Sequence, residues 1–98
     1  MDENFLGGFE WDEEKRLTVL EKHGIDFEDV VGVFENNVMT TSSRHDGEQR
    51  WIAVGLLNGI MIAVVYTMRG DTCRLITARR ARRNERKEYH ARYPGAGP

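Results

Sequence analysis

The sequence predicts an α+β fold with two N-terminal helices, a four-stranded antiparallel sheet and a C-terminal helix. Three observations carry this prediction. Two capped helical stretches open the chain, apolar runs with strand alternation follow around an Asn-Gly pair, and an Arg-rich helical stretch ends before Pro94. The 98 residues suit a single domain over 1–98, with an ordered core over about 9–93 and frayed ends.

The first helix is expected to follow Asp12, a good N-cap, and to end at Gly24 in the C′ position. A short strand over 9–11 precedes it. Asp26 is expected to cap a second helix that ends at the Asn-Asn pair 36–37. Apolar residues in that stretch recur at i, i+3, i+4 and i+7, which predicts one buried helix face.

Strands are expected over residues 38–43, 50–57, 60–68 and 73–79, before a final helix over 82–93. The Asn58-Gly59 pair between apolar runs predicts a type I′ hairpin. That turn places Trp51 opposite Tyr66, and the next turn places Leu75 beside Tyr66.

Alternation then sorts the strand side chains onto two faces. The first face is expected to carry Trp51, Ala53, Ile62, Val64, Tyr66, Leu75, Thr77 and Arg79. The second is expected to carry Ile52, Val54, Leu56, Met61, Val65 and Ile76, together with Arg50, Thr67, Arg74 and Arg80. Because the second face has more bulky branched residues, it is expected to hold the main core.

The charge of the chain is strongly polarised, although its formal net charge is only −2. Residues 1–35 carry eleven acidic and three basic residues, whereas residues 69–93 carry nine basic and three acidic residues. This distribution indicates a polyanion-binding site in the C-terminal third.

The final helix repeats positive charge at i, i+4 spacing, as in the pairs Arg82/Arg86 and Arg83/Lys87. Each such pair destabilises a helix by roughly 0.2–0.5 kcal/mol. A bound anion reverses these penalties, and the Arg fork suits phosphate. The alternative is a merely solvated charged face. Tyr89, on the same helix, is either a packing anchor or a catalytic acid.

Several classes of site and location are not expected. The single cysteine, Cys73, indicates a reducing, cytoplasmic setting, and no apolar run is long enough to span a membrane. The histidines and Cys73 lack zinc-ligand spacing, so no metal and no cofactor are expected.

Three motifs in order give the chain a specific resemblance: KHG at 22–24, VVYTMRG at 64–70 and ARRA at 78–81. Further matching residues include those at 9–12, Lys15, 25–28, Glu48, Arg50, Gly55, 74–77, Glu85, Arg86 and Tyr89. Over about residues 9–90 the sequence resembles the BrnT family of toxins from bacterial type II toxin–antitoxin systems.

The resemblance implies a RelE-like fold and a metal-independent ribonuclease that cleaves mRNA, free or on the ribosome, and slows translation. It also implies a BrnA-type ribbon-helix-helix antitoxin, with operator DNA bound only through the toxin–antitoxin complex. A small hydroxyl residue commonly follows the ARRA segment in the family and caps the last helix. Here Arg82 stands at that position, so the cap is expected to be lost.

Metal-free RNA cleavage requires a protein to orient the ribose 2′-OH, stabilise charge on the phosphate and move protons. The proposed catalytic residues are Arg79 and Arg80 at the phosphate and Glu85 as base, with Tyr89, His23 and His45 in reserve. The RNA-binding candidates are Arg50, Arg69, Arg74, Arg82, Arg83 and Arg86. The alternative is a catalytically inert homologue that binds an antitoxin or nucleic acid.

Overall fold

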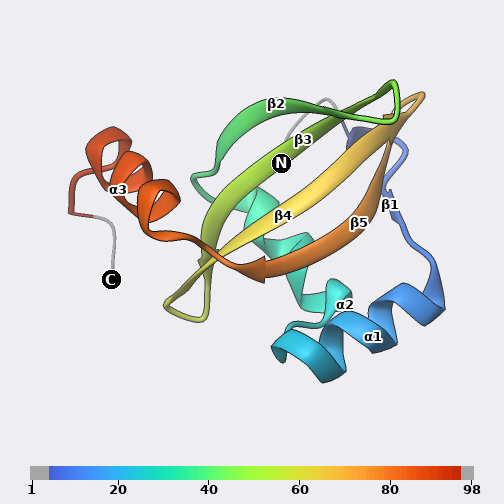
Figure 1. The fold of residues 1–98 in the computed structure, drawn as a ribbon, viewed down its shortest axis with the longest axis horizontal. Coiled ribbons are helices and arrows are strands. Elements are labelled where there is room, and N and C mark those ends of the chain that lie inside the picture. Colours follow the sequence, from blue (N-terminus) through green and yellow to red (C-terminus); the bar gives the residue numbers. More distant parts are fainter. Residues whose placement is uncertain (1–4, 96–98) are drawn as a thin grey trace.

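The computed structural model describes residues 5–95 and shows three helical regions around one twisted sheet (Figure 1). The strands lie in the order β1-β5-β4-β3-β2. The elements are β1 (Phe9–Glu10), α1 (Glu13–His23), α2 (Phe27–Val30), the 3-10 helix η2 (Val31–Glu35), β2 (Met39–His45), β3 (Glu48–Leu57), β4 (Ile60–Arg69), β5 (Thr72–Arg80) and α3 (Arg83–Arg92). The expectation of frayed ends concerns, in part, residues 1–4 and 96–98, which lie outside the described residues.

The sheet is five-stranded and mixed, so the predicted four-stranded antiparallel sheet was wrong. The short strand expected before the first helix joins the sheet as β1 and pairs in parallel with β5. Phe9 lies opposite Cys73 and Glu10 opposite Arg74. The Cys73 N–H donates to the Gly8 carbonyl at 2.9 Å. No local turn encodes this pairing, because the two strands are separated by most of the chain.

The second N-terminal helix is also not the regular helix that was predicted. Only one α-helical turn forms after Asp26, whose side chain accepts the Glu28 N–H at 3.0 Å. The chain then tightens into η2, which contains Gly32 and two valines of low helix propensity. The prediction of two N-terminal helices was therefore wrong in this part, while the α+β class is confirmed.

The boundaries of α1 agree with the sequence. Asp12 accepts the Glu14 N–H at 2.8 Å, and Gly24 ends the helix in the left-handed conformation at φ 69°. Arg16 donates to both carboxylate oxygens of Asp26, at 3.1 and 3.0 Å, and so ties α1 to the start of α2.

A β-bulge in β5 changes which side chains share a face. The predicted pairs Trp51–Tyr66 and Tyr66–Leu75 are confirmed. The register then shifts between Val65 and Tyr66, so that Ile76 is an extra residue on β5. Beyond it, Arg79 lies opposite Ala63 and Arg80 opposite Ile62.

Because of this bulge, the predicted faces of Thr77, Arg79 and Arg80 were wrong. Thr77 and Arg79 belong to the second face, beside Val65 and Ala63, and Arg80 belongs to the first. The two consecutive arginines therefore point to opposite sides of the sheet.

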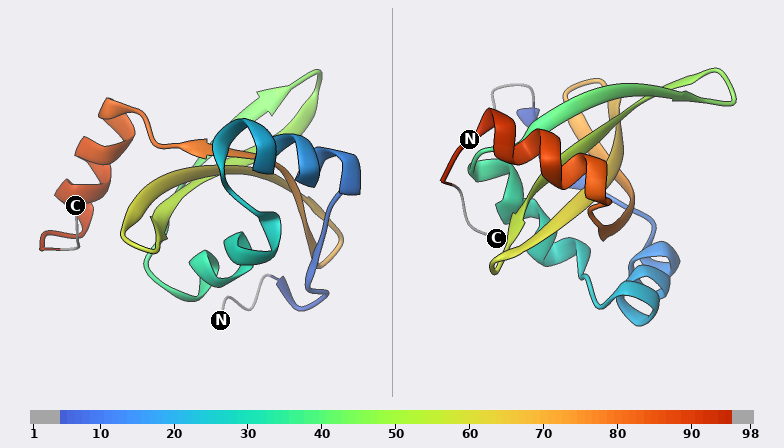
Figure 2. Two further views of the ribbon diagram at one scale, coloured as in Figure 1. Left: turned by 90° about the horizontal axis from the view of Figure 1, so that it is seen from below. Right: turned by 60° about the vertical axis from the view of Figure 1, so that its left-hand side comes forward.

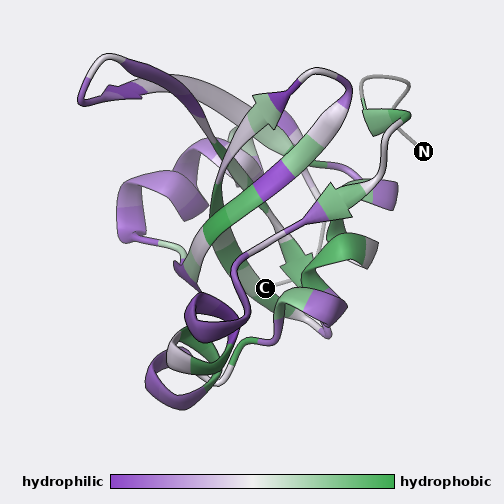
Figure 3. Ribbon diagram, turned by 90° about the vertical axis from the view of Figure 1, so that its right-hand side faces the viewer, coloured by the Kyte–Doolittle hydropathy of each residue, from purple (hydrophilic) through white to green (hydrophobic). Residues whose placement is uncertain are grey.

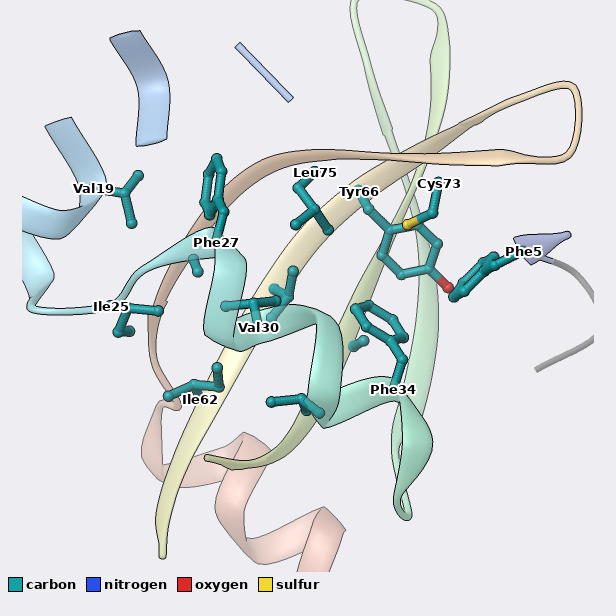
Figure 4. Close-up of a cluster of buried hydrophobic side chains, with 14 residues drawn as sticks. Phe5, Val19, Ile25, Phe27, Val30, Phe34, Ile62, Tyr66, Cys73 and Leu75 are labelled. Atoms are coloured by element: carbon teal, nitrogen blue, oxygen red, sulfur yellow. The ribbon is translucent and has the colours of Figure 1, made fainter. Parts of the chain in front are cut away.

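The main core lies on the first face, not on the second as predicted (Figure 4). Phe27 and Phe34 fill the space above this face, where the strand residue Ala53 is small. The thiol of Cys73 is buried there, and burial raises its pKa to about 12. The cluster comprises Phe5, Val19, Ile25, Phe27, Val30, Val33, Phe34, Ala53, Ile62, Val64, Tyr66, Cys73, Leu75 and Ala78.

The second face carries a smaller cluster, Met39, Val54, Met61, Ala63, Ala81 and Tyr89, which includes a residue of α3. Helices α3 and α1 stand at opposite ends of the molecule, which separates the basic and acidic parts of the chain (Figure 2). Strands β3 and β4 are hydrophobic in their middle, and the end of the β2–β3 hairpin is hydrophilic (Figure 3). Among the described residues, no helix is long and apolar enough to cross a membrane.

Candidate functional site

Helix α3 covers only one half of the second sheet face. The Tyr89 hydroxyl donates to the Asn37 carbonyl at 3.1 Å, and the Tyr93 hydroxyl donates to the Val38 carbonyl at 3.0 Å. These bonds hold α3 over Met39 at the start of β2 and over Val54 in the second half of β3. The rest of this face, toward the β2–β3 turn and the β4–β5 turn, is the open half.

Arginines and hydroxyl side chains make up much of the open half. Strand register places Ser43 beside Arg50, and Arg74 between Thr67 and Glu10. The next row holds Thr41, Ile52, Val65 and Thr77. With about 3.3 Å per strand residue, the stretch of β5 from Arg74 to Arg79 spans roughly 13–16 Å. This is a long polar track on an otherwise apolar sheet.

One end of the open half is hollowed into a cleft of about 180 Å³. We call it the basic cleft, after its four cations Lys15, Arg50, Arg69 and Arg74. Its other lining residues are Asp12, Glu48, Thr67, Leu75 and Ile76. The cleft thus gathers cations from α1, β3, β4 and β5.

Carboxylates hold two of the cleft arginines in place. The Arg50 Nε lies 2.9 Å from Glu48 Oε2, and the Arg74 Nη1 lies 2.8 Å from Glu10 Oε2. Both pairs are partly exposed, so each adds little to stability. Their effect is to fix where the guanidinium groups point, while part of each remains free to bind an anion.

Arg79 is held in the same way at the other end of the track, in the row of Ala63 and Val54 where the open half meets α3. Its Nη1 and Nη2 donate to the two carboxylate oxygens of Glu85, at 2.8 and 2.9 Å. Nη1 also donates to the Arg80 carbonyl at 3.2 Å. Of the five guanidinium N–H donors, the Nε–H and one Nη2–H keep no acceptor among the described residues. These two lie on one edge of the guanidinium plane, where they match two oxygens of a phosphate.

Glu85 also replaces the helix cap that Arg82 cannot supply. An arginine side chain has no acceptor, so Arg82 gives α3 no N-cap hydrogen bond. Instead, Glu85 Oε1 accepts the Arg82 N–H at 2.7 Å, which is one half of a capping box. Glu85 therefore joins the end of β5 to the start of α3.

The hydrogen bond from Arg79 lowers the pKa of Glu85, and the Arg82 N–H adds to this effect against partial burial. The same pair raises the pKa of Arg79. Both groups are thus held charged, and the Glu85 carboxylate is a weaker base than a free glutamate.

Substituting Glu85 tests this pair through the pH dependence of stability. Because the folded-state pKa is lowered from its ordinary 4.5, the contribution of Glu85 is complete above that value. It is lost as pH falls through the folded-state pKa. Glu85→Gln is expected to lower the free energy of unfolding at pH 7 by about 1.5–3 kcal/mol. Urea unfolding checks this, and the gap from wild type is expected to narrow at pH 3. If the difference in free energy of unfolding between wild type and Glu85→Gln is the same at pH 7 and pH 3, the Arg79–Glu85 pair does not stabilise the folded protein.

Other predicted site residues lie away from the open half. Arg80 lines a hollow of about 120 Å³ with His23, near the end of α1 and the β3–β4 turn. It also lines a second hollow, of about 270 Å³, with Arg86. Arg82 and Arg83 are exposed at the start of α3. Arg79 and Arg80 are therefore not brought together, and His23 is near Arg80 alone.

The remaining candidates have different surroundings. Tyr89 is only 2% exposed, and burial raises the pKa of its hydroxyl, which donates to a backbone carbonyl. His45 is exposed at the β2–β3 turn, with its Nε2 3.3 Å from Asp46 Oδ2. Neither side chain lines the basic cleft.

Sequence reasoning missed several residues of the basic cleft. Arg50, Thr67 and Arg74 were correctly placed on one face by strand alternation. Lys15 and Asp12 were not found, because they reach the cleft through the packing of α1 against β5. Glu48 had one signal: it lies two residues before Arg50 in the same strand, and so on the same face. Among the residues the structure describes, no group of three or more His, Cys, Asp or Glu side chains is arranged to hold a metal ion.

Comparison with known protein families gives a match over most of the chain. Residues 11–85 match the family described as the ribonuclease toxin BrnT of type II toxin–antitoxin systems. No curated protein matches the chain. The matched span is well over half of the 98 residues, and it includes the basic cleft, Arg79 and Glu85. The chain belongs to the BrnT family of ribonuclease toxins of type II toxin–antitoxin systems.

Proposed function

We propose that this protein cleaves mRNA without a metal ion, on the open half of the second sheet face, and thereby inhibits translation in the cytoplasm. One observation carries the proposal: three arginines on this face, Arg50, Arg74 and Arg79, are each held by a carboxylate. Guanidinium groups fixed in this way supply positive charge where negative charge develops on a phosphate.

In the proposed reaction, the ribose 2′-oxygen attacks the adjacent phosphorus, and the bond from phosphorus to the 5′-oxygen breaks. The products are a 2′,3′-cyclic phosphate and a 5′-hydroxyl. The free edge of Arg79 binds two non-bridging oxygens of the reacting phosphate. It stabilises the extra charge of the phosphorane, while the cations of the basic cleft hold flanking phosphates.

We assign Glu85 a positioning role in place of the general-base role expected from the sequence. Its carboxylate binds Arg79 and the Arg82 N–H, and its lowered pKa makes it a poor proton acceptor. Tyr89 is buried, and His23 lies with Arg80 on the other side of the sheet. The 2′-OH proton passes to solvent water, and the leaving 5′-oxygen takes up a proton from water to become the 5′-hydroxyl. Alignment and charge stabilisation provide the acceleration.

For the partners, we propose a BrnA-type ribbon-helix-helix antitoxin and mRNA, with operator DNA bound only through the complex. Membership of the BrnT family supports an antitoxin and an RNA substrate. A catalytically inert module that binds an antitoxin or nucleic acid is the alternative function, because the pKa of Glu85 is lowered and no histidine lines the basic cleft.

The test uses a DNA strand that contains a single ribonucleotide, incubated with the pure protein in excess EDTA. Cleavage is expected only 3′ of the ribonucleotide, with a cyclic phosphate and a 5′-hydroxyl as the new ends. A co-expressed antitoxin is expected to abolish it. Cleavage that requires added Mg²⁺, or that leaves 5′-phosphates, contradicts the mechanism, and no cleavage at all supports the inert alternative.

A further inference from the structure

The arginines at the β5–α3 corner differ from Arg50, Arg74 and Arg79 because no carboxylate holds them. Within the described residues, no acidic group lies within 4.0 Å of the guanidinium of Arg80, Arg82, Arg83 or Arg86. Arg86 has only a 3.4 Å contact from Nη1 to the Ala81 carbonyl. This corner is therefore a concentration of unpaired positive charge, whereas Arg50, Arg74 and Arg79 are each paired with a carboxylate.

Arg80 and Arg86 meet at one hollow. The hollow has a volume of about 270 Å³ and is lined by Gly59, Ile60, Met61, Arg80, Ala81 and Arg86. Its lining residues come from the β3–β4 turn, the start of β4, the end of β5 and α3. Figure 1 shows the β3–β4 turn next to the segment where β5 passes into α3. Because of the bulge in β5, Arg80 belongs to the first sheet face, whereas Met61 and Ala81 belong to the cluster on the second, so the hollow lies at the end of the sheet and shares no lining residue with the basic cleft. The hollow is thus separate from the basic cleft.

We propose that Arg80 and Arg86 form a second phosphate-binding surface, which holds the RNA strand beyond the reacting phosphate. This inference rests on the proposed function for its ligand. Arg79 and Arg80 are consecutive residues with Cα atoms about 3.8 Å apart. A strand whose reacting phosphate sits at Arg79 therefore has only to pass around the edge of β5 to meet Arg80.

The two surfaces have different roles: the paired arginines orient the reacting phosphate, and the unpaired arginines attract the RNA. A paired arginine orients one phosphate well but attracts RNA weakly, since its carboxylate cancels most of its charge at a distance. Unpaired arginines give long-range attraction and counterion release, which dominate the affinity for nucleic acids. The like-charged corner, unfavourable in the free protein, becomes favourable once a phosphate is bound.

The test measures binding of a fluorescent, fully 2′-O-methylated strand, which cannot be cleaved, by anisotropy at several salt concentrations. Arg80→Ala/Arg86→Ala is compared with Lys87→Ala/Arg92→Ala, which removes the same charge from exposed positions of α3. Each single-strand contact contributes about 0.7 to the slope of log K against log salt. The first variant is expected to lower the slope by about 1.4 and to weaken binding at low salt.

A slope equal to that of wild type overturns the inference, and so does an equal loss in the Lys87→Ala/Arg92→Ala control. If Arg80→Ala/Arg86→Ala binds RNA as wild type does but cleaves it more slowly, Arg80 acts in the reaction itself, and this result also overturns the inference. If Arg80→Ala/Arg86→Ala binds a deca-glutamate peptide more weakly than wild type but binds RNA equally well, the inference is overturned, and the surface binds an acidic protein segment instead. Because the strand cannot be cleaved, the binding result can be interpreted even if the protein proves not to cleave RNA.

Discussion

Arg79→Ala is expected to lower kcat/KM for RNA cleavage by about 10²–10³-fold, which corresponds to roughly 3–4 kcal/mol of transition-state stabilisation. The substitution removes the two N–H donors proposed to face the reacting phosphate. It also removes the partner that lowers the pKa of Glu85. Arg79→Lys is expected to recover little, because an ammonium group cannot bind Glu85 and a phosphate as two parallel forks. Single-turnover cleavage in EDTA checks both expectations.

Arg92→Ala is the matched control, since it removes one exposed arginine of α3 that lies at the far end from Arg79. All variants are compared below the onset of thermal unfolding, followed by circular dichroism, because loss of the Arg79–Glu85 pair also destabilises the β5–α3 corner. If folded Arg79→Ala cleaves as fast as Arg92→Ala, then Arg79 does not bind the reacting phosphate.

Phe27→Ala is expected to lower the free energy of unfolding by about 3–5 kcal/mol. The side chain of Phe27 is fully buried, and its ring contacts that of Trp11 edge-on at 6.0 Å between centroids. It stands at the start of α2, which is a single helical turn. Truncation therefore leaves a cavity between α2 and the first face of the sheet. The total free energy of unfolding of a small domain is about 5–15 kcal/mol, so this loss is a large part of it.

Urea unfolding at neutral pH measures this change. Leu17→Ala is the control, because the Leu17 side chain is 51% exposed on α1 and its truncation is expected to cost less than about 0.5 kcal/mol. If Phe27→Ala and Leu17→Ala lower the free energy of unfolding by similar amounts, the main core does not lie between α2 and the sheet.

Most of the fold follows from local signals in the sequence. The caps Asp12 and Asp26, the αL glycine Gly24 and the type I′ turn at Asn58-Gly59 all occur where they were predicted. Each depends only on residues close in the chain. The parallel pairing of β1 with β5 has no such signal, because two-residue strands joined across most of the chain are selected by tertiary packing.

The sequence predicted the sheet faces of the candidate site residues less well than the caps and turns, and one residue, Ile76, explains much of the difference. Strand alternation placed Arg50, Thr67 and Arg74 together correctly, because these residues precede the irregularity in β5. Past Ile76, the bulge reverses every assignment, so Arg79 and Arg80 exchange faces. A bulge without glycine leaves little trace in one sequence. The side-chain pairs that hold the arginines, such as Arg79–Glu85, depend on this reversal.

The central claim is that the open half of the second sheet face is where RNA is cleaved. Its most direct test is single-turnover cleavage in EDTA by Arg50→Ala/Arg74→Ala, compared with Arg44→Ala/Arg92→Ala. Both variants lose two positive charges, but Arg44 and Arg92 lie outside the basic cleft. We expect the first variant to lose about 10²-fold in kcat/KM while the control stays near wild type. Equal values of kcat/KM for the two folded variants would contradict the claim and would mean that RNA is cleaved at another surface.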